Sequence, residues 1–380
     1  AQNGFFEQNF DLTGTQMVPQ TASLANGGYV IAWASETQDG DGNGVYAQRY
    51  NSAGVAQGSE FRVNVSTTGN QGGRDPGEEA LAVTGLAGGG FAVTWYSAHA
   101  DTSGDVYARL YNADGTAQTG EFQVNSYTSS AQWFPQVTRL ANGQLLVTWA
   151  SFGQDGTLYG VYGQRFDATT GATVGAEFIL NSTVTGSQGG GDSTTNDDRL
   201  HDVVGLAGGG WVAAWWDSAQ DGSGGGIYMQ RFDANGTMVG GEVRVNSVTS
   251  GAQTHVTVTA LNDGGYTVAW SSDGQDGSNH GVYQKVYEAN GLERLSRPLL
   301  ERPGLRGELA EALAVIPLDS GENGWRGRLA PCLETLEASQ QRLLFGLDAG
   351  EVVERGGIDG RETVQGSPPR ALRTAALGRF

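Results

Sequence analysis

The aspartates of a short polar loop, which recurs five times, have the clearest chemical potential in this sequence. In the first copy Asp39, Asp41 and Asn43 alternate with glycine, in the sequence DGDGNG. Oxygen ligands at alternate positions, followed by a glycine that permits a sharp turn, can converge on one hard cation such as calcium. The loops therefore predict calcium as a bound cofactor. The later copies offer these further ligands: Asp101, Ser103, Asp105, Asp155, Asp221 and Asp276.

The same loops also fit ordinary turns. Asp-Gly and Asn-Gly pairs are typical of hairpins, and an aspartate side chain can cap a turn through its own backbone. An EF-hand is excluded, because Tyr50 stands where that loop needs a bidentate glutamate and because strands flank the loop. Calcium would need further oxygens from backbone carbonyls or from an adjacent loop.

Five tyrosines, one after each polar loop, form a second set of candidate ligand-binding residues. Aromatic faces stack on sugars, which would give saccharide sites between the units. A residue present in every unit can equally pack the core between units, so both interpretations stay open. The five are Tyr46, Tyr107, Tyr162, Tyr228 and Tyr283.

Catalytic motifs are lacking in the sequence. It contains no G-x-S-x-G elbow and no P-loop, and its four histidines, which we interpret as surface or loop residues, form no H-E-x-x-H pair. The sequence favours a non-enzyme, although two of its many carboxylates could serve a glycosidase. In that case the candidates are the acidic residues of two long insertions: Asp75, Glu78, Glu79, Asp192, Asp197 and Asp198.

Five tandem units carry these residues, with boundaries near 8–60, 61–121, 122–177, 178–242 and 243–291. Each unit has a tryptophan strand, such as GGYVIAWAS around Trp33. A polar loop, a strand such as GVYAQRY, a turn and a strand such as FRVN follow it, and another strand leads to the next tryptophan. The tryptophan strand is apolar on both faces, which is typical of a central strand buried between neighbouring sheets.

Four short strands with hairpin connections are what a propeller blade requires, and one such unit cannot bury both of its faces alone. We therefore predict an all-β repeat protein, a five-bladed β-propeller. An open β-solenoid and a propeller completed elsewhere are the alternatives. The second and fourth units hold extra residues at the same place, which indicates a double-length repeat with long loops. Such loops carry function in many repeat proteins, or here preserve a tolerated duplication.

The charge of the chain limits its partners. The 380 residues have a formal net charge of −19, and the acidity belongs to the repeats. An acidic surface argues against nucleic acid and against anionic membranes. No run of 18 apolar residues is present, so the sequence predicts no membrane span. Cys332 is the single cysteine, which leaves no internal disulfide and no cysteine-based zinc site.

The composition changes after Gly291. Residues 292–380 are rich in Leu and Arg and lack strand alternation. The leucines at 329, 333 and 336 approximate one helical face, and residues 305–316 suggest a short helix, so we expect a partly helical or weakly structured tail. It is a small helical domain, a linker or targeting tail, or an out-of-frame extension.

The phrase G-G-x-x-V-x-W-x-S, followed by Q-D-G and G-V-Y-x-Q-R-[FY], resembles the tandem modules of large secreted bacterial proteins. Adhesins and hemolysin-type calcium-associated proteins are among them. The resemblance covers Gln8 to Gly291 and implies export and often calcium. The chain lacks a G-G-x-G-x-D nonapeptide array, so the calcium β-roll chemistry of the hemolysin type does not carry over.

We therefore expect a calcium-stabilised propeller that works outside the cell or at its surface. Its expected role is that of an adhesion or interaction module for a cell-surface glycan, a protein or another cell-surface component. The first alternative is a lectin with sites between blades, and the second is a glycan-active hydrolase or lyase.

Overall fold

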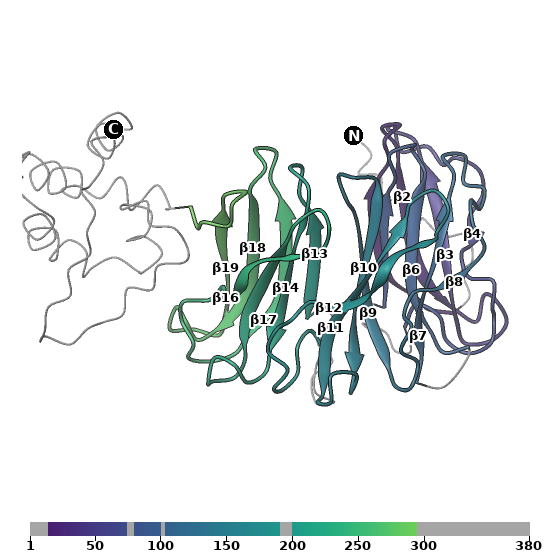
Figure 1. Cartoon of the computed structure of the whole chain (residues 1–380). Coiled ribbons are helices and arrows are strands. Elements are labelled where there is room, and N and C mark those ends of the chain that lie inside the picture. The colour runs from purple at the N-terminus through teal and green to yellow at the C-terminus, as the bar shows by residue number, and fades with distance from the viewer. Residues whose placement is uncertain (1–13, 74–79, 100–102, 191–199, 295–380) are drawn as a thin grey trace, which may run out of the picture. The chain divides into compact units, whose positions relative to one another are not determined.

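The computed structural model of the chain describes residues 14–73, 80–99, 103–190 and 200–294 (Figure 1). The described strands all belong to one compact unit, Ala1–Ala289. Within these ranges no helix has the length and apolar character needed to cross a membrane. The predicted helical tail lies almost wholly outside the described residues.

Five antiparallel sheets follow one another along the chain, and the predicted all-β, five-bladed propeller is confirmed. Each sheet is one blade. The first holds β1 (Gln16–Ser23), β2 (Tyr29–Glu36), β3 (Asn43–Tyr50) and β4 (Phe61–Arg62), and the second holds β5 (Leu81–Gly85), β6 (Phe91–Ser97), β7 (Asp105–Tyr111) and β8 (Phe122–Gln123). The third holds β9 (Gln132–Arg139), β10 (Gln144–Phe152), β11 (Tyr159–Asp167) and β12 (Thr173–Ile179). The fourth holds β13 (His201–Gly205), β14 (Trp211–Asp217), β15 (Gly226–Phe232) and β16 (Met238–Arg244), and the fifth holds β17 (Gln253–Ala260), β18 (Tyr266–Asp273) and β19 (His280–Tyr287).

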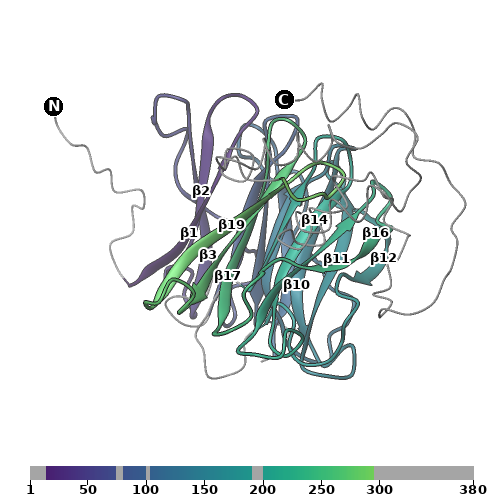
Figure 2. The same cartoon turned by 90° about the vertical axis from the view of Figure 1, so that its left-hand side faces the viewer.

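The blades pack in chain order through their first strands and their faces. β1 contacts β5, β5 contacts β9, β9 contacts β13, and β13 contacts β17. Four apolar clusters lie at the four junctions between successive blades, and each combines side chains of both neighbours. Among the described strands, β17 and β1 share no comparable contact, so the ring has a seam between the fifth and the first blade. Figure 2 shows the array from the side of the fifth blade.

The tryptophan strands are the second strands of the sheets, as predicted. β6 is buried along its whole length, and Trp95, Trp149 and Trp215 are fully buried. The Gly-Gly pair before four of these strands has a steric cause; the third strand is preceded by Gly143-Gln144 instead. A Cβ on Gly28 would lie 2.3 Å from the carbonyl oxygen of Tyr50 in the adjacent strand, and the preceding Gly27 has a φ of +84°. In the first blade, the hairpin that leads into the central strand therefore requires both glycines.

The sheets are offset from the sequence units. β4, which opens the second sequence unit, pairs with β3 of the first blade, where Ala47 lies opposite Phe61. The same offset recurs at β8, whereas β12 and β16 begin in their own unit and end in the next. The outermost strand of these blades thus lies at or beyond the end of its sequence unit.

Odd and even blades begin differently. The first strand of each odd blade has a bulge at a non-glycine residue of positive φ: Val18 (47°), Phe134 (56°) and His255 (52°). The even blades instead begin with an isolated bridge, Gln71 to Ser97 or Gln188 to Asp217, followed by the long insertion. The double-length repeat of the sequence is therefore also a structural repeat of two blades.

Candidate functional site

The side chains of the loop aspartates accept hydrogen bonds from backbone N–H groups of the protein itself. Asp39 Oδ1 accepts the backbone N–H of Asp41 at 3.4 Å, as in an Asx turn, and Asp41 Oδ2 accepts the backbone N–H of Gly69 at 3.1 Å. Asn43 is buried and donates to the carbonyl oxygen of Gly73 at 2.8 Å. The same turn forms at Asp155, Asp221 and Asp276, each of which accepts the backbone N–H of the residue two positions later.

The second carboxylate oxygen of Asp39 belongs to a buried polar network that was not predicted from the sequence. Asn64 is 1% exposed, and its Oδ1 accepts the backbone N–H of Val45 at 2.8 Å. Its Nδ2 donates to Asp39 Oδ2 at 2.9 Å and to Gln71 Oε1 at 3.1 Å. Equivalent buried asparagines hold the same strand position in the next three blades: Asn125, Asn181 and Asn246. The recurrence of V-N or L-N in four units was the signal available in the sequence.

The second blade reaches the same geometry from a different sequence position. Asp105 stands where the first blade has Gly44, is 3% exposed, and accepts from Asn125 Nδ2 at 2.7 Å. A Cβ on Gly44 would lie 2.7 Å from Asp39 Oδ2. In the second blade, one aspartate in the strand, Asp105, therefore takes the place of both the strand glycine Gly44 and the loop aspartate Asp39 of the first blade. Asp101 lies outside the described residues.

A calcium site is not evident in the arrangement of these loops. Within the described ranges no three acidic, histidine or cysteine side chains come together as a metal would require. The oxygens of Asp39 and Asp41 accept from backbone and asparagine N–H groups, which need no cation. Calcium binding stays a prediction.

The candidate tyrosines lie opposite the tryptophans on the adjacent strands. Tyr46, Tyr107, Tyr162 and Tyr228 are buried, and Tyr283 is half-buried. Burial, with the nearby Asp155, raises the pKa of Tyr162 to about 12, and burial with Asp221 does the same for Tyr228. In the four buried positions little ring surface is left for a sugar, so packing between blades is their evident role.

Carboxylates are scarce in the centre of the propeller. On the five first strands, as far as they are described, Asp202 is the one acidic residue. It accepts from Thr257 Oγ1 at 2.8 Å and from the backbone N–H of Val258 at 3.0 Å, which joins the fourth blade to the fifth. Its neighbour His201 is buried on β13, contrary to the expectation of a surface or loop position. The six acidic candidates of the insertions lie outside the described residues.

A surface of aromatic side chains stands out on the third blade, at the end that carries the polar loops. We define the Trp133 surface as Trp133, Phe152 and Tyr159. The ring centroids of Trp133 and Tyr159 are 6.3 Å apart, and those of Tyr159 and Phe152 are 5.0 Å apart. Phe152 is 38% exposed, and the other two rings are half-buried. Three adjoining rings therefore reach solvent together.

Neighbouring blades hold the Trp133 surface in place. Trp133 Nε1 donates to the carbonyl oxygen of Ser103 at 3.2 Å, and its ring meets the buried ring of Tyr96 edge-on at 6.3 Å. On the other side, Gly190 lies so close to Tyr159 that an added Cβ would be 2.4 Å from the ring. The described ends of both long insertions lie beside the Trp133 surface, because the backbone N–H of Gly72 donates to the carbonyl oxygen of Tyr96 and that of Gln188 donates to the carbonyl oxygen of Tyr159.

The Trp133 surface has no counterpart in the other odd blades. The position of Trp133, immediately before the bulge residue with positive φ, is occupied by Met17 in β1 and by Thr254 in β17. The sequence prediction rested on residues that recur in every unit, and Trp133 is an aromatic residue present in only one. The signal available was the tryptophan outside the tryptophan strand.

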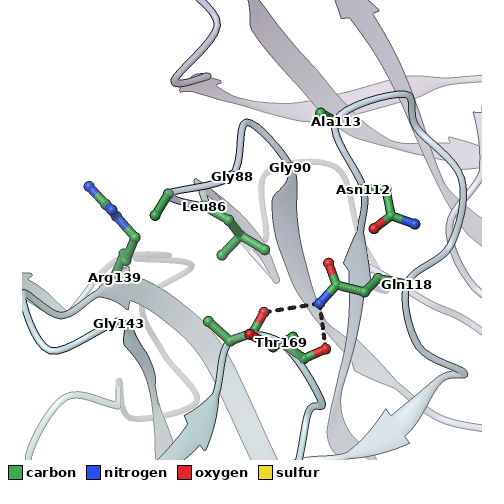
Figure 3. Close-up of a pocket in the computed structure, with 11 residues that line it drawn as sticks. Leu86, Gly88, Gly90, Asn112, Ala113, Gln118, Arg139, Gly143 and Thr169 are labelled. Carbon is green, nitrogen blue, oxygen red and sulfur yellow. Dashed lines mark hydrogen bonds between the residues drawn. The ribbon is translucent and has the colours of Figure 1, made fainter.

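A cavity of about 480 Å³ lies at the opposite end, between the second and third blades (Figure 3). Turns of both blades line it, and Gln118 Nε2 bridges across it to the carbonyl oxygens of Ala168 and Thr169. Arg139 is its one charged lining residue. No aromatic ring and no carboxylate lines this cavity, so it offers fewer specific contacts for a saccharide than the Trp133 surface does.

Comparison with known proteins identifies no family for this chain. No protein-family model matches the chain, and no curated protein matches it in sequence. A protein of unknown function from Dyadobacter fermentans has a similar structure, at 10% identity and a TM-score of 0.49, over 73% of this chain and 79% of that chain. An α-L-arabinanase from Penicillium chrysogenum, complexed with arabinobiose, is 16% identical at a TM-score of 0.44, over 72% and 77%. An endo-arabinase from Bacteroides thetaiotaomicron is 11% identical at 0.41, over 70% and 92%.

These similarities correct the expected function. The predicted role as an adhesion or interaction module is contradicted, because those similar structures whose activity is named are glycan-cleaving enzymes. The glycan-active alternative agrees with them better. At such low identity the likeness extends to the fold alone, so the function is inferred below from residues of this chain.

Proposed function

We propose that this protein acts on carbohydrate, and that the Trp133 surface holds the saccharide chain. The observation that carries the proposal is the group of three solvent-reaching rings, Trp133, Phe152 and Tyr159. Aromatic rings are costly to leave in water, and adjoining exposed rings mark binding surfaces. A sugar ring presents an apolar C–H face that packs flat on such a side chain, while its hydroxyls stay solvated.

The fixed position of Trp133 suits this role. Its indole N–H is occupied by Ser103, and its edge rests on Tyr96, so the ring is held before a ligand arrives. Binding to a preformed surface avoids the entropy cost of ordering side chains. The three rings form a row, which fits a chain of sugars better than a single one.

Cleavage of the bound glycan is the further step that this proposal makes testable. A glycosidase needs two carboxylates, about 5 to 10 Å apart. Asp202, the one carboxylate on the described first strands, accepts hydrogen bonds from Thr257 and Val258, so the proposal assigns no catalytic pair there. Release of reducing ends from a bound polysaccharide would show that the protein also cleaves it.

The experiment measures binding and cleavage of arabinan, xylan and a panel of other polysaccharides. Wild type is compared with Trp133→Ala, with Trp133→Phe, and with Met17→Ala, which changes the equivalent position of the first blade. We expect Trp133→Ala to weaken binding about tenfold or more, or about 1.4 kcal/mol. Trp133→Phe and Met17→Ala should bind within about threefold of wild type. Equal binding by wild type and Trp133→Ala, or no bound glycan in the panel, would overturn the proposal.

A further inference from the structure

Two exposed aliphatic side chains extend the Trp133 surface. Leu158 is 46% exposed and Val184 is 41% exposed. Leu158 lies in the polar loop between β10 and β11, directly before Tyr159, and Val184 lies in the segment that follows β12. Thr157 Oγ1 lies 2.6 Å from the carbonyl oxygen of Val184, so the two segments meet. We define Leu158 and Val184 as the aliphatic pair.

The other blades have polar or small residues at these positions. Leu158 stands three residues before Val161, and its equivalents are Gly42, Ser103, Gly224 and Asn279. Val184 stands three residues after the buried Asn181, and its equivalents after the other buried asparagines are Thr67, Thr128 and Thr249. Phe152 of the Trp133 surface stands three residues after Trp149, and its equivalents are Glu36, Ala98, Ser218 and Asp273. The repeat itself therefore does not require an apolar side chain at any of the three positions.

The backbone that presents Leu158 has a fixed shape. The backbone N–H of Gly153 donates to the carbonyl oxygen of Leu158 at 2.6 Å, and that of Gly274 donates to the carbonyl oxygen of Asn279 at 3.0 Å. The polar loops of the third and fifth blades thus share one closing bond, although one loop presents leucine and the other asparagine. The exposed apolar surface follows from the residue type and not from an irregular loop.

An unsubstituted sugar chain would leave the aliphatic pair unused. Sugar hydroxyls need hydrogen-bond partners, and the side chains of leucine and valine have neither a donor nor an acceptor. Such side chains gain stability when an apolar group covers them. The carboxylate of Asp155, which accepts from Thr157 Oγ1 at 2.9 Å, opposes a negatively charged group at this place. A stable protein partner buries about 20 to 30 residues on each side, far more than this surface offers.

We infer that the saccharide bound at the Trp133 surface carries a neutral apolar substituent, such as an aryl ester, and that the aliphatic pair and Phe152 bind this substituent. The assignment depends on the proposed glycan binding, because the sugar and its substituent belong to one ligand. The ring of Tyr159 lies between those of Trp133 and Phe152, at 6.3 Å and 5.0 Å. Trp133 and Tyr159 then stack on sugar rings, and the substituent lies at the Phe152 end of the row.

A matched pair of ligands tests this assignment. One is an arabino-oligosaccharide that carries a single feruloyl ester, and the other is the same oligosaccharide after alkaline removal of the ester. Titration calorimetry of the full chain measures both affinities. We expect the ester to bind at least about tenfold more tightly, which corresponds to about 1.4 kcal/mol.

A double variant, Leu158→Asn with Val184→Thr, should lose most of this gain. It should bind the oligosaccharide without ester within about twofold of wild type. Both substitutions introduce residue types that other blades have at these positions, in Asn279 and Thr249, so the thermal midpoint should match that of wild type. Val55→Thr is the control, because Val55 is 57% exposed in a turn at the opposite end of the first blade. It should bind both ligands as wild type does.

The outcomes separate this inference from the proposed function. Equal affinity of wild type for the two ligands, or an ester gain that the double variant keeps, would overturn the inference alone, provided that Trp133→Ala still weakens binding of both. Binding of neither ligand would also overturn it, and the proposed function falls as well if no polysaccharide of the panel binds. A dimer that the double variant abolishes would show that a second copy covers the aliphatic pair, and would overturn the inference.

Discussion

The buried asparagine of each of the first four blades should contribute more to stability than any loop aspartate. Asn64→Ala removes an acceptor from the backbone N–H of Val45 and a donor from Gln71 Oε1 and Asp39 Oδ2. An unsatisfied buried polar group costs about 1 to 3 kcal/mol. The Val45 N–H and the Gln71 oxygen are both buried, so we expect a loss of about 3 kcal/mol in the free energy of unfolding. In a domain of this size that lowers the thermal midpoint by roughly 6 to 12 °C.

Urea unfolding followed by tryptophan fluorescence measures this effect, because a tryptophan lies on the central strand of every blade. Asn142→Ala is the matched control, since Asn142 is exposed, accepts the N–H of Gln144 in its turn and donates only one long bond, of 3.5 Å, to the carbonyl oxygen of Ala234. It should change stability by less than about 0.5 kcal/mol. A loss below about 1 kcal/mol for Asn64→Ala would refute the assignment of the asparagine as the organising residue of the blade.

Three further predictions concern the loops and one buried carboxylate. If the first loop binds calcium, calcium should raise the thermal midpoint of wild type but not that of the Asp39→Ala, Asp41→Ala double variant. Equal midpoints of wild type with calcium and with chelator would refute calcium binding. Gly226→Ala should be destabilising, because the new Cβ would lie 2.7 Å from Asp221 Oδ2, whereas Gly208→Ala, where nothing lies within 4 Å, should be neutral or slightly stabilising in thermal melts. Burial raises the pKa of Asp217, so its contribution favours folding at low pH and is lost as the pH rises through the raised pKa. Asp217→Asn should therefore gain stability relative to wild type with increasing pH in urea titrations, and a constant difference across that range would contradict this.

The fold was predictable from the sequence because its period and its hydrophobic pattern agree. Each tryptophan strand is apolar on both faces, and only a sheet packed on two sides satisfies that pattern. The offset of the blades from the sequence units was not predictable, because the pattern of a repeat does not say where one sheet ends. The pairing of Phe61 with Ala47, across the boundary placed at residue 61, decides it.

The polar residues were harder to interpret. The loop aspartates were selected by their spacing, yet their roles depend on Asn64 and its equivalents, which lie far from them in sequence. An asparagine at the end of a strand reads as the start of a turn, so its buried role shows only in three dimensions. Trp133 was missed because it occurs in only one unit, whereas the prediction relied on residues that recur in every unit.

The alternation between bulged and inserted blade starts has a consequence for how such an array can grow. Every described junction joins an odd blade to an even one, and the aromatic rings of Tyr96 and Trp216 lie on the even side. Five is an odd number, so the seam joins two blades of the same parity. Duplication of two blades at a time would preserve the alternation, whereas loss or duplication of one internal blade would place two blades of the same kind side by side. The unit of inheritance in this propeller is therefore the pair of blades, and the fifth blade is the one that makes the ring asymmetric.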